Sequence, residues 1–303
     1  MTPMRDHAPY LAEEVAHDHA DGLMTRRDAL RQLGLMGFGV VGASALLAGC
    51  GSDDDTASAT TTTTTTTAAP SPGPAATPAR PAVATQAVTY AGTRGQLQGA
   101  WAPAATARGA VLVVHENRGL TDHIRSIAGR LAADGYSALA VDLLSEEGGT
   151  AGVENVPTVL GAKPVERLVD DMVSTVDELE RRQRGAKLGT VGFGFGGTMT
   201  WLMVENEPRL AAAAPFYGQV RTGVDFPRGK AAVLGVYAEL DGRVNGTRDQ
   251  VKAALDDAGL PNEIRTFPGV DHAFFDDTGP RYNETQAAAA YAAVLDWFGR
   301  HLG

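Results

Sequence analysis

Residues 187–197 have the pattern of a catalytic turn whose central position holds a glycine. Residues 187–191 predict a buried strand, and residues 192–197, which read GFGFGG, predict a tight turn into a helix. Hydrolases with a G-x-S-x-G elbow hold a serine or cysteine above the sheet at such a turn. The nucleophile position here is Gly194, which has no side chain. The segment therefore predicts a catalytic elbow without its attacking atom, and a plain glycine-rich turn is the alternative.

Two further residues have the types and the chain order of a catalytic acid and base. Asp241 follows the apolar run 231–237, and His272 follows the next predicted strand, 263–267. The acid of a nucleophile–acid–base hydrolase needs a rigid position at a strand end, within reach of a histidine on a later loop. We therefore predict that Asp241 orients His272 as a base. Glu239 competes for the role of the acid, and an aspartate before a glycine is alone only a turn signal.

The elements around these residues predict an α/β fold with a mostly parallel central sheet and helices on both faces. Residues 110–115 form a continuous apolar run, as expected for a central strand that is covered on both faces. Strand patterns then alternate with helix patterns, which implies parallel βαβ units whose ligands bind at the carboxyl ends of the strands. The predicted strands are 86–91, 96–101, 110–115, 136–141, 187–191, 210–216, 231–237 and 263–267, and the predicted helices are 121–134, 164–184, 197–206, 247–258 and 283–301.

Charged residues after the third predicted strand are candidates for substrate binding. Residues 115–119 read HENRG and occupy the loop that provides the second oxyanion amide in α/β-hydrolases. Arg118 in this loop is a candidate for holding an anionic substrate group, and so is Arg281 in a later loop. The amide of Phe195, at the start of the helix after the turn, is a candidate oxyanion donor. A simple solvated loop is the alternative for residues 115–119.

The glycine-rich segment also fits the G-x-G-x-x-G fingerprint of dinucleotide-binding folds. That fingerprint requires the first strand–helix turn and an acidic residue about 20 positions later, at the end of the next strand. Several strands precede Gly192, and residues 216–218 end the next strand without a carboxylate. We therefore expect no cofactor. We expect no metal site either, because the folded part contains no cysteine to bind one. His123 and His301 fall on predicted helices and are expected at the surface.

Residues 1–50 predict an export signal. Arg26 and Arg27 precede a short apolar run, 33–49, that ends in Leu-Ala-Gly before Cys50. An arginine pair before a moderately hydrophobic stretch is typical of the twin-arginine route, and Leu-Ala-Gly-Cys is similar to a bacterial lipobox. Cys50, the only cysteine of the chain, is then the lipidated first residue of an exported protein that is anchored to the bacterial cell envelope. An N-terminal anchor that is never cleaved is the alternative.

Composition divides the rest of the chain. Residues 1–23 are acidic and contain three histidines without a partner set for a metal, and we interpret them as solvated and unstructured, unless translation begins at Met24. Residues 51–85 consist mainly of Ser, Thr, Ala and Pro and predict a disordered tether. Residues 86–303 are long enough for one α/β domain with its own core. The formal net charge of −10 argues against nucleic-acid binding.

Together these segments resemble the dienelactone hydrolase family of α/β-hydrolases, over the whole domain from residue 86. The resemblance rests on HENRG at 115–119, GFGFGG at 192–197, Leu240-Asp241, GVDHAF at 269–274 and TGPRY at 278–282. It implies hydrolysis of lactones and related esters through a Cys-His-Asp triad, with a strand-end glutamate that tunes the cysteine. By motif position, the resemblance implies that His272 is the base and Asp241 the orienting acid. It implies that Glu116 is the glutamate, and that the amides of Phe195 and Asn117 are the oxyanion donors.

The resemblance places Gly194 where the family has its cysteine. Without an attacking atom no acyl-enzyme forms, and activity on lactones or esters is expected to be weak or lost. Two alternatives remain open: a module that binds a small anionic ligand without turnover, and a slow hydrolase in which Glu116 and His272 activate a water. The expected partners are a small lactone, ester or anionic ligand and, through the lipid anchor only, a membrane.

Overall fold

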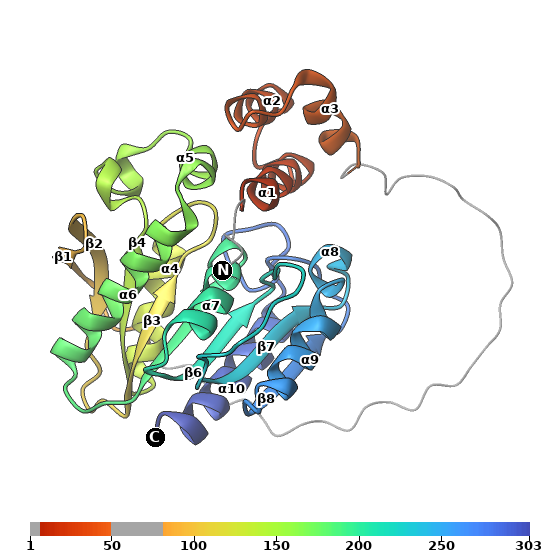
Figure 1. Cartoon of the computed structure of the whole chain (residues 1–303). Helices are drawn as coiled ribbons and strands as arrows, with labels where there is room; N and C mark the ends of the chain where they lie inside the picture. Colours follow the sequence, from red (N-terminus) through yellow and green to blue (C-terminus); the bar gives the residue numbers. More distant parts are fainter. Residues whose placement is uncertain (1–6, 50–80) are drawn as a thin grey trace, which may run out of the picture.

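The domain from residue 86 is built around one eight-stranded sheet, shown as a computed structural model in Figure 1. The structure describes residues 7–49 and 81–303. The strand order is β1-β2-β4-β3-β5-β6-β7-β8, with β1 and β2 antiparallel at one edge and parallel pairing from β4 to β8. The strands are β1 (Gln86–Gly92), β2 (Gly95–Ala102), β3 (Gly109–Val114), β4 (Tyr136–Asp142), β5 (Leu188–Phe193), β6 (Leu210–Phe216), β7 (Ala232–Ala238) and β8 (Asn262–Phe267). The predicted mostly parallel α/β architecture is confirmed.

Helices cover both faces of this sheet. The helices of the domain are α4 (Asp122–Ala133), α5 (Val156–Ala162), α6 (Val165–Arg182), α7 (Phe195–Asn206), α8 (Gly242–Asn245), α9 (Arg248–Asp257) and α10 (Glu284–His301), with short 3-10 turns η1 (Ser145–Glu147) and η2 (Thr150–Gly152). One core lies under α6, α7 and α9, and the other under α4 and α10. In β3, Leu112 faces the first core while Val111 and Val113 face the second, which explains a continuous apolar run on a central strand.

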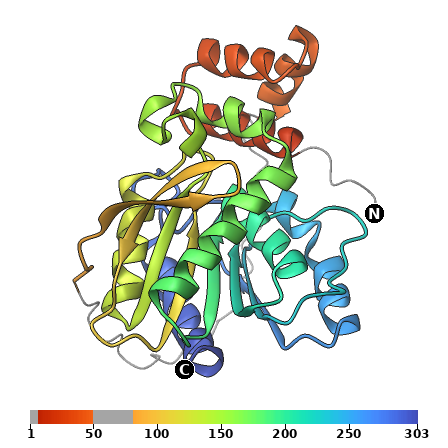
Figure 2. The same ribbon diagram turned by 60° about the vertical axis from the view of Figure 1, so that its left-hand side comes forward.

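Residues 7–49 form three helices, α1 (Ala8–Ala20), α2 (Arg26–Leu35) and α3 (Val40–Gly49). The prediction that residues 1–23 are solvated and unstructured is therefore wrong for α1. Leu11 and Val15 are fully buried, because they belong to an apolar stripe at helical spacing that the surrounding acidic and histidine residues obscured. α1 packs against α5, and Figures 1 and 2 show it above the carboxyl edge of the sheet.

The predicted export segment is only partly described by the structure. No helix within residues 7–49 or 81–303 is long and apolar enough to cross a bilayer. α3, which contains most of the apolar run, has 10 residues, about half the number that a spanning helix needs. Cys50 and residues 51–80 of the predicted tether lie outside the described residues. Lipidation and the tether therefore stay predictions.

Candidate active site

The turn between β5 and α7 places Gly194 at the carboxyl edge of the sheet. Gly194 has φ +51° and ψ −113°, a conformation that residues with a side chain rarely adopt. Its N–H donates to the carbonyl of Phe216 at 3.1 Å, which ties the turn to β6. A Cβ placed on Gly194 would lie 3.4 Å from Nε2 of His272 and 3.9 Å from the ring of Tyr217. The imidazole therefore faces the place where the side chain of a nucleophile would begin.

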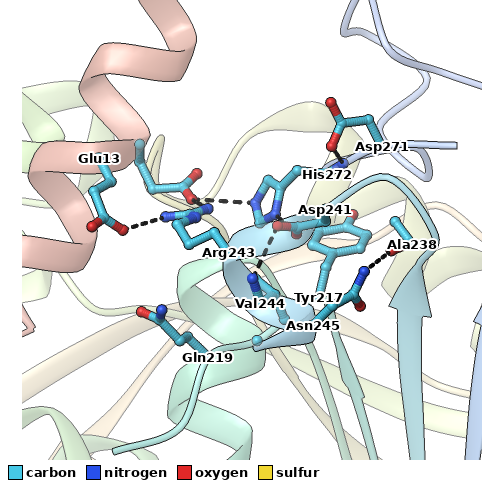
Figure 3. A network of polar contacts seen from close by, with 12 residues as sticks. Glu13, Tyr217, Gln219, Ala238, Asp241, Arg243, Val244, Asn245, Asp271 and His272 are labelled. Atoms are coloured by element: carbon cyan, nitrogen blue, oxygen red, sulfur yellow. Dashed lines mark hydrogen bonds and ion pairs between the residues drawn. The ribbon is translucent and has the colours of Figure 1, made fainter. Parts of the chain in front are cut away.

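Asp241 and His272 form a buried hydrogen-bonded pair (Figure 3). Asp241 follows β7 and caps α8, where its Oδ1 accepts from the N–H of Val244 at 3.1 Å. Its Oδ2 accepts from Nδ1 of His272 at 2.6 Å, and both residues are 3% exposed. A carboxylate can only accept, so Nδ1 carries the hydrogen and Nε2 is left to face Gly194. Glu239 is exposed and accepts from the N–H of Gly269, so it does not reach the histidine.

The charge state of the aspartate suits an orienting role. Burial by itself would raise the pKa of Asp241, but the adjacent imidazole outweighs burial and lowers this pKa below its ordinary value. Asp241 is therefore ionised at neutral pH, which fixes the orientation of the imidazole ring and keeps a hydrogen on Nδ1.

Glu116 reaches the same edge from the loop after β3. β3 and β5 are parallel neighbours with Val114 opposite Gly192, so the residues that follow these strands lie side by side. Oε1 of Glu116 accepts from the hydroxyl of Tyr217 at 3.3 Å. Burial, with the carboxylate of Asp276, raises the pKa of Glu116 to about 8. At neutral pH Glu116 is therefore mostly protonated and is a hydrogen donor rather than a base.

The two candidate oxyanion amides belong to neighbouring loops at this edge. Phe195 is the first residue of α7, and the first amides of a helix have no partner within the helix and favour an anion. Asn117 follows Glu116 and lines the same cavity as Gly194. The side-chain amide of Asn117 donates to Asp18 of α1 at 3.3 Å. Both backbone amides therefore lie at the strand ends that frame Gly194.

The cavity at Gly194 has a volume of only about 40 Å³. Its wall includes most of the predicted site residues, namely Glu116, Asn117, Arg118, Gly194, His272 and Arg281. Helix α1 contributes the facing wall through Glu14, His17 and Asp18, and through its C-cap residue Asp21. Arg281 is turned toward α1, and its Nε donates to Asp21 at 2.9 Å. Arg118 is half-buried in the same wall.

Sequence reasoning missed the site residues Tyr10, Glu14 and Arg243. Oε1 of Glu14 lies 3.3 Å from Nε2 of His272, and the same carboxylate pairs with Arg243. The guanidinium of Arg243 lies 4.7 Å from the ring centre of Tyr10. Burial alone would lower the pKa of His272, but the carboxylates of Glu14 and Asp241 raise it to about 10. With Glu14 in place, His272 is therefore an imidazolium at neutral pH, and it can accept a proton on Nε2 only when Glu14 is absent.

Tyr217 was also missed, although its position at the end of β6 was a signal. Its ring centre lies 4.9 Å from that of His272, and its φ of +35° is unusual for a residue with a side chain. Strained backbone of this kind is concentrated at functional sites. The expectation that His123 lies at the surface is wrong, because its face of α4 packs against Phe275. His123 is the one histidine in the described segments that belongs to a candidate metal cluster, with Asp276 and Asp277.

The chain is similar to known proteins. A family model described as "Dienelactone hydrolase family" matches residues 98–302. The "Putative carboxymethylenebutenolidase" of Salmonella typhi is 32% identical over 209 residues, which cover 64% of this chain and 77% of that protein. The protein of the same name from Methylorubrum extorquens is 31% identical over 209 residues, covering 63% of this chain and 72% of its own.

Solved structures show the same fold. The crystal structure of a "Putative Dienelactone Hydrolase" from Klebsiella pneumoniae is 26% identical, with a TM-score of 0.63, and covers 72% of this chain and 98% of its own. The dienelactone hydrolase of Anabaena variabilis matches with a TM-score of 0.58 at 20% identity, over 72% of this chain and 98% of its own. The match to the family model lies within the domain from residue 86.

Proposed function

The chain belongs to the dienelactone hydrolase family, and we propose that it is an exported, lipid-anchored member that acts on, or binds, a small lactone or ester with weak or absent turnover. One observation carries the proposal: Nε2 of His272, backed by Asp241, faces the position of a Cβ at Gly194. The acid and the base are present and the atom that they would activate is missing. Removal of a triad nucleophile costs several orders of magnitude in rate.

The chemistry that this geometry supports requires a nucleophile at position 194. A thiol there would transfer its proton to Nε2 of His272 and attack the carbonyl carbon of the ester or lactone. The amides of Phe195 and Asn117 would hold the resulting oxyanion. Departure of the alcohol with the proton from His272 would leave an acyl-enzyme, which a water would hydrolyse. With Gly194 this route is closed, and a water must attack directly.

Export and lipidation are proposed from the sequence of residues 24–50 alone. The arginine pair Arg26-Arg27, the short apolar run and Leu-Ala-Gly before Cys50 support twin-arginine export followed by lipidation of Cys50. The composition of residues 51–80 suits a tether between the lipid and the domain.

Restoring the nucleophile tests the assignment of the site. In a chain of residues 81–303, Gly194→Cys is expected to raise kcat/KM for p-nitrophenyl esters and a small lactone at least about tenfold. Adding His272→Ala to that variant is expected to abolish the gain. The Klebsiella structure consists almost entirely of the corresponding region, so this part of the chain is expected to fold alone. A fast wild type that is indifferent to His272→Ala would show the assignment to be wrong.

A second candidate function is binding of a small anionic ligand without turnover. It is favoured by Arg118 and Arg281, two cations in the wall of the cavity at Gly194. Calorimetric binding of a carboxylate-bearing lactone that is weakened by Arg118→Gln, with no product formed, would support it. Water-mediated hydrolysis by Glu116 and His272 predicts instead a measurable turnover that Glu116→Gln removes. The raised pKa of Glu116 makes that route slow, because the protonated carboxyl cannot accept a proton.

A further inference from the structure

Helix α1 occupies the mouth of the candidate site. Three acidic or histidine residues of α1, together with its C-cap residue Asp21, form one wall of the cavity at Gly194. The hydroxyl of Tyr10 lies 3.4 Å from the position of a Cβ on Gly194. The volume that remains, about 40 Å³, holds a few waters at most, whereas sites for small molecules measure at least about 300 Å³. A lactone or ester therefore cannot reach Gly194 while α1 is in place.

The contacts of α1 follow one face of the helix. Tyr10, Glu14, Asp18 and Asp21 are spaced by four, four and three positions, so their side chains line one stripe. Each of the three carboxylates meets a polar group of the site: Glu14 meets His272, Asp18 meets Asn117, and Asp21 meets Arg281. Each carboxylate of this stripe therefore has its own polar or charged partner in the site.

Arg243 fastens the centre of this stripe to the domain. It pairs with Glu14 and, at 3.3 Å, with Glu13, and its guanidinium lies over the ring of Tyr10. Figure 3 shows Arg243 extended from the start of α8 toward α1, with His272 between Asp241 and this helix. Glu14 is only 7% exposed, so solvent has little access to its ion pair with Arg243, and dissolved salt screens the pair only weakly. Buried paired charges of this kind fix one arrangement, because separating them leaves a charge without a partner.

We propose that α1 is a built-in plug that blocks the site of the full-length precursor, and that cleavage before Cys50 removes it from the mature protein. The second half rests on the proposed export, since residues 1–49 leave the chain only if the signal is processed. The twin-arginine route carries folded proteins. A domain that is already folded before export can therefore hold the plug until processing.

The plug blocks the chemistry of the site as well as access to it. Oε1 of Glu14 contacts Nε2 of His272, the nitrogen that would accept a proton from a nucleophile or a water. Tyr10 does not replace the missing nucleophile, because burial and the carboxylate of Glu14 hold its pKa well above the ordinary value. Its hydroxyl therefore stays protonated and fills the space beside Gly194.

Removal of the plug would enlarge the site toward an apolar cavity. A second cavity, of about 150 Å³, is lined by Tyr10 and by apolar residues of α7 and the loop after β6, including Met199, Trp201, Leu202 and Val220. Tyr10 stands between this cavity and Gly194. Once α1 leaves, the two spaces join and offer an apolar subsite beside the polar one.

A single thiol at position 194 measures whether the site is plugged. In the full-length chain with Cys50→Ser and Gly194→Cys, the added substitution Glu14→Ala is expected to raise the alkylation rate at least about tenfold. A bulky maleimide should gain more than iodoacetamide, whereas a mere change in thiol ionisation would alter both rates equally. Asp249→Asn, an exposed carboxylate on α9, is the matched control and should change neither rate. Equal rates with and without Glu14→Ala would overturn the proposal.

Hydrogen exchange keeps the test independent of that cysteine. In the wild-type full-length chain, amide hydrogens of α1 should exchange at least about tenfold more slowly than in the Glu14→Ala variant, while those of β5 stay unchanged. In the alkylation experiment, a chain that begins at Met24 and carries Cys50→Ser and Gly194→Cys lacks α1 and sets the upper limit of thiol access. Unprotected α1 amides in the wild type would refute the plug. Neither measurement depends on turnover, so an inactive enzyme leaves the result intact.

Discussion

Gly194 and Gly196 lie in the same turn but are required for different reasons. At Gly194 the backbone conformation is unfavourable for a side chain, while a Cβ would meet its neighbours at 3.4 Å or more. At Gly196 a Cβ would lie 2.3 Å from the carbonyl oxygen of Val114, which is part of β3 and cannot move away. A side chain at position 194 is therefore disfavoured by backbone strain. A side chain at position 196 is disfavoured because α7 approaches the sheet too closely to leave room for it.

This difference predicts two distinct costs of an added methyl group. Gly194→Ala is expected to lower the free energy of unfolding by about 1–3 kcal/mol, the usual cost of a strained backbone conformation. Gly196→Ala is expected to cost more than this, because the backbone of β3 or α7 must shift. Urea unfolding of both variants, followed by circular dichroism, measures the two costs. A larger loss for Gly194→Ala would contradict the geometry of the turn.

At the scale of elements, the loop that carries Glu116 is braced by Thr150 of η2. The hydroxyl of Thr150 donates to Asp142 at 2.9 Å and accepts from the N–H of Leu120 at 2.8 Å. Asp142, the last residue of β4, also accepts from the N–H of Thr150 at 2.7 Å. This chain of hydrogen bonds joins the loop after β4 to the loop after β3. Two loops at the carboxyl edge are thus held together by one threonine.

Removal of that hydroxyl should loosen both loops. Thr150→Val keeps the shape of the side chain but leaves the N–H of Leu120 without its partner, at an expected cost of about 1–3 kcal/mol. Thr150→Ser retains the hydroxyl and should recover most of this loss. Thermal and urea unfolding of the two variants give the comparison. If valine and serine destabilise the protein equally, the hydrogen bonds of the hydroxyl are not what holds the loops.

At the scale of the whole molecule, docking of α1 depends on groups that titrate. Burial opposes the charge on His272, but Glu14 and Asp241 raise its pKa to about 10; the share that Glu14 contributes stabilises the docked state and is lost as the pH rises through 10. Asp18, whose pKa is raised to about 6 chiefly by burial, acts in the same direction. For Glu14, burial is outweighed by His272 and Arg243, so its lowered pKa stabilises docking above 4.5 and loses effect as the pH falls below it.

Docking is therefore expected to be tightest near pH 5–6 and weaker at pH 9. Protection of α1 amides, corrected for the intrinsic exchange rate, should fall at least severalfold between these values. Glu14→Gln should flatten the change above pH 6.5, because His272 then loses the carboxylate on its Nε2. Protection that increases toward pH 9 would show that these ion pairs do not control docking. Arg243 stays charged throughout, so some docking persists at high pH.

Much of the fold and of the site was predictable from local pattern. The continuous apolar run of β3 predicted a central strand, and the alternation of strands and helices fixed the parallel order of elements. Because the carboxyl ends of parallel strands meet at one edge, Gly194, Asp241 and His272 were expected together there. The short elements α5 and α8 were missed, since a few residues give no measurable periodicity.

The sequence alone determined which residues gather at the edge of the sheet, because strand order and loop position follow from patterns within each βα unit. Only the tertiary structure decided that α1 covers this edge, that Tyr217 supports Glu116, and that His123 is buried. Glu14 and Arg243 are 229 positions apart, and nothing near either one signals the other. Their contact depends on how a separate helix packs on the finished sheet, which is a property of surfaces that exist only after folding.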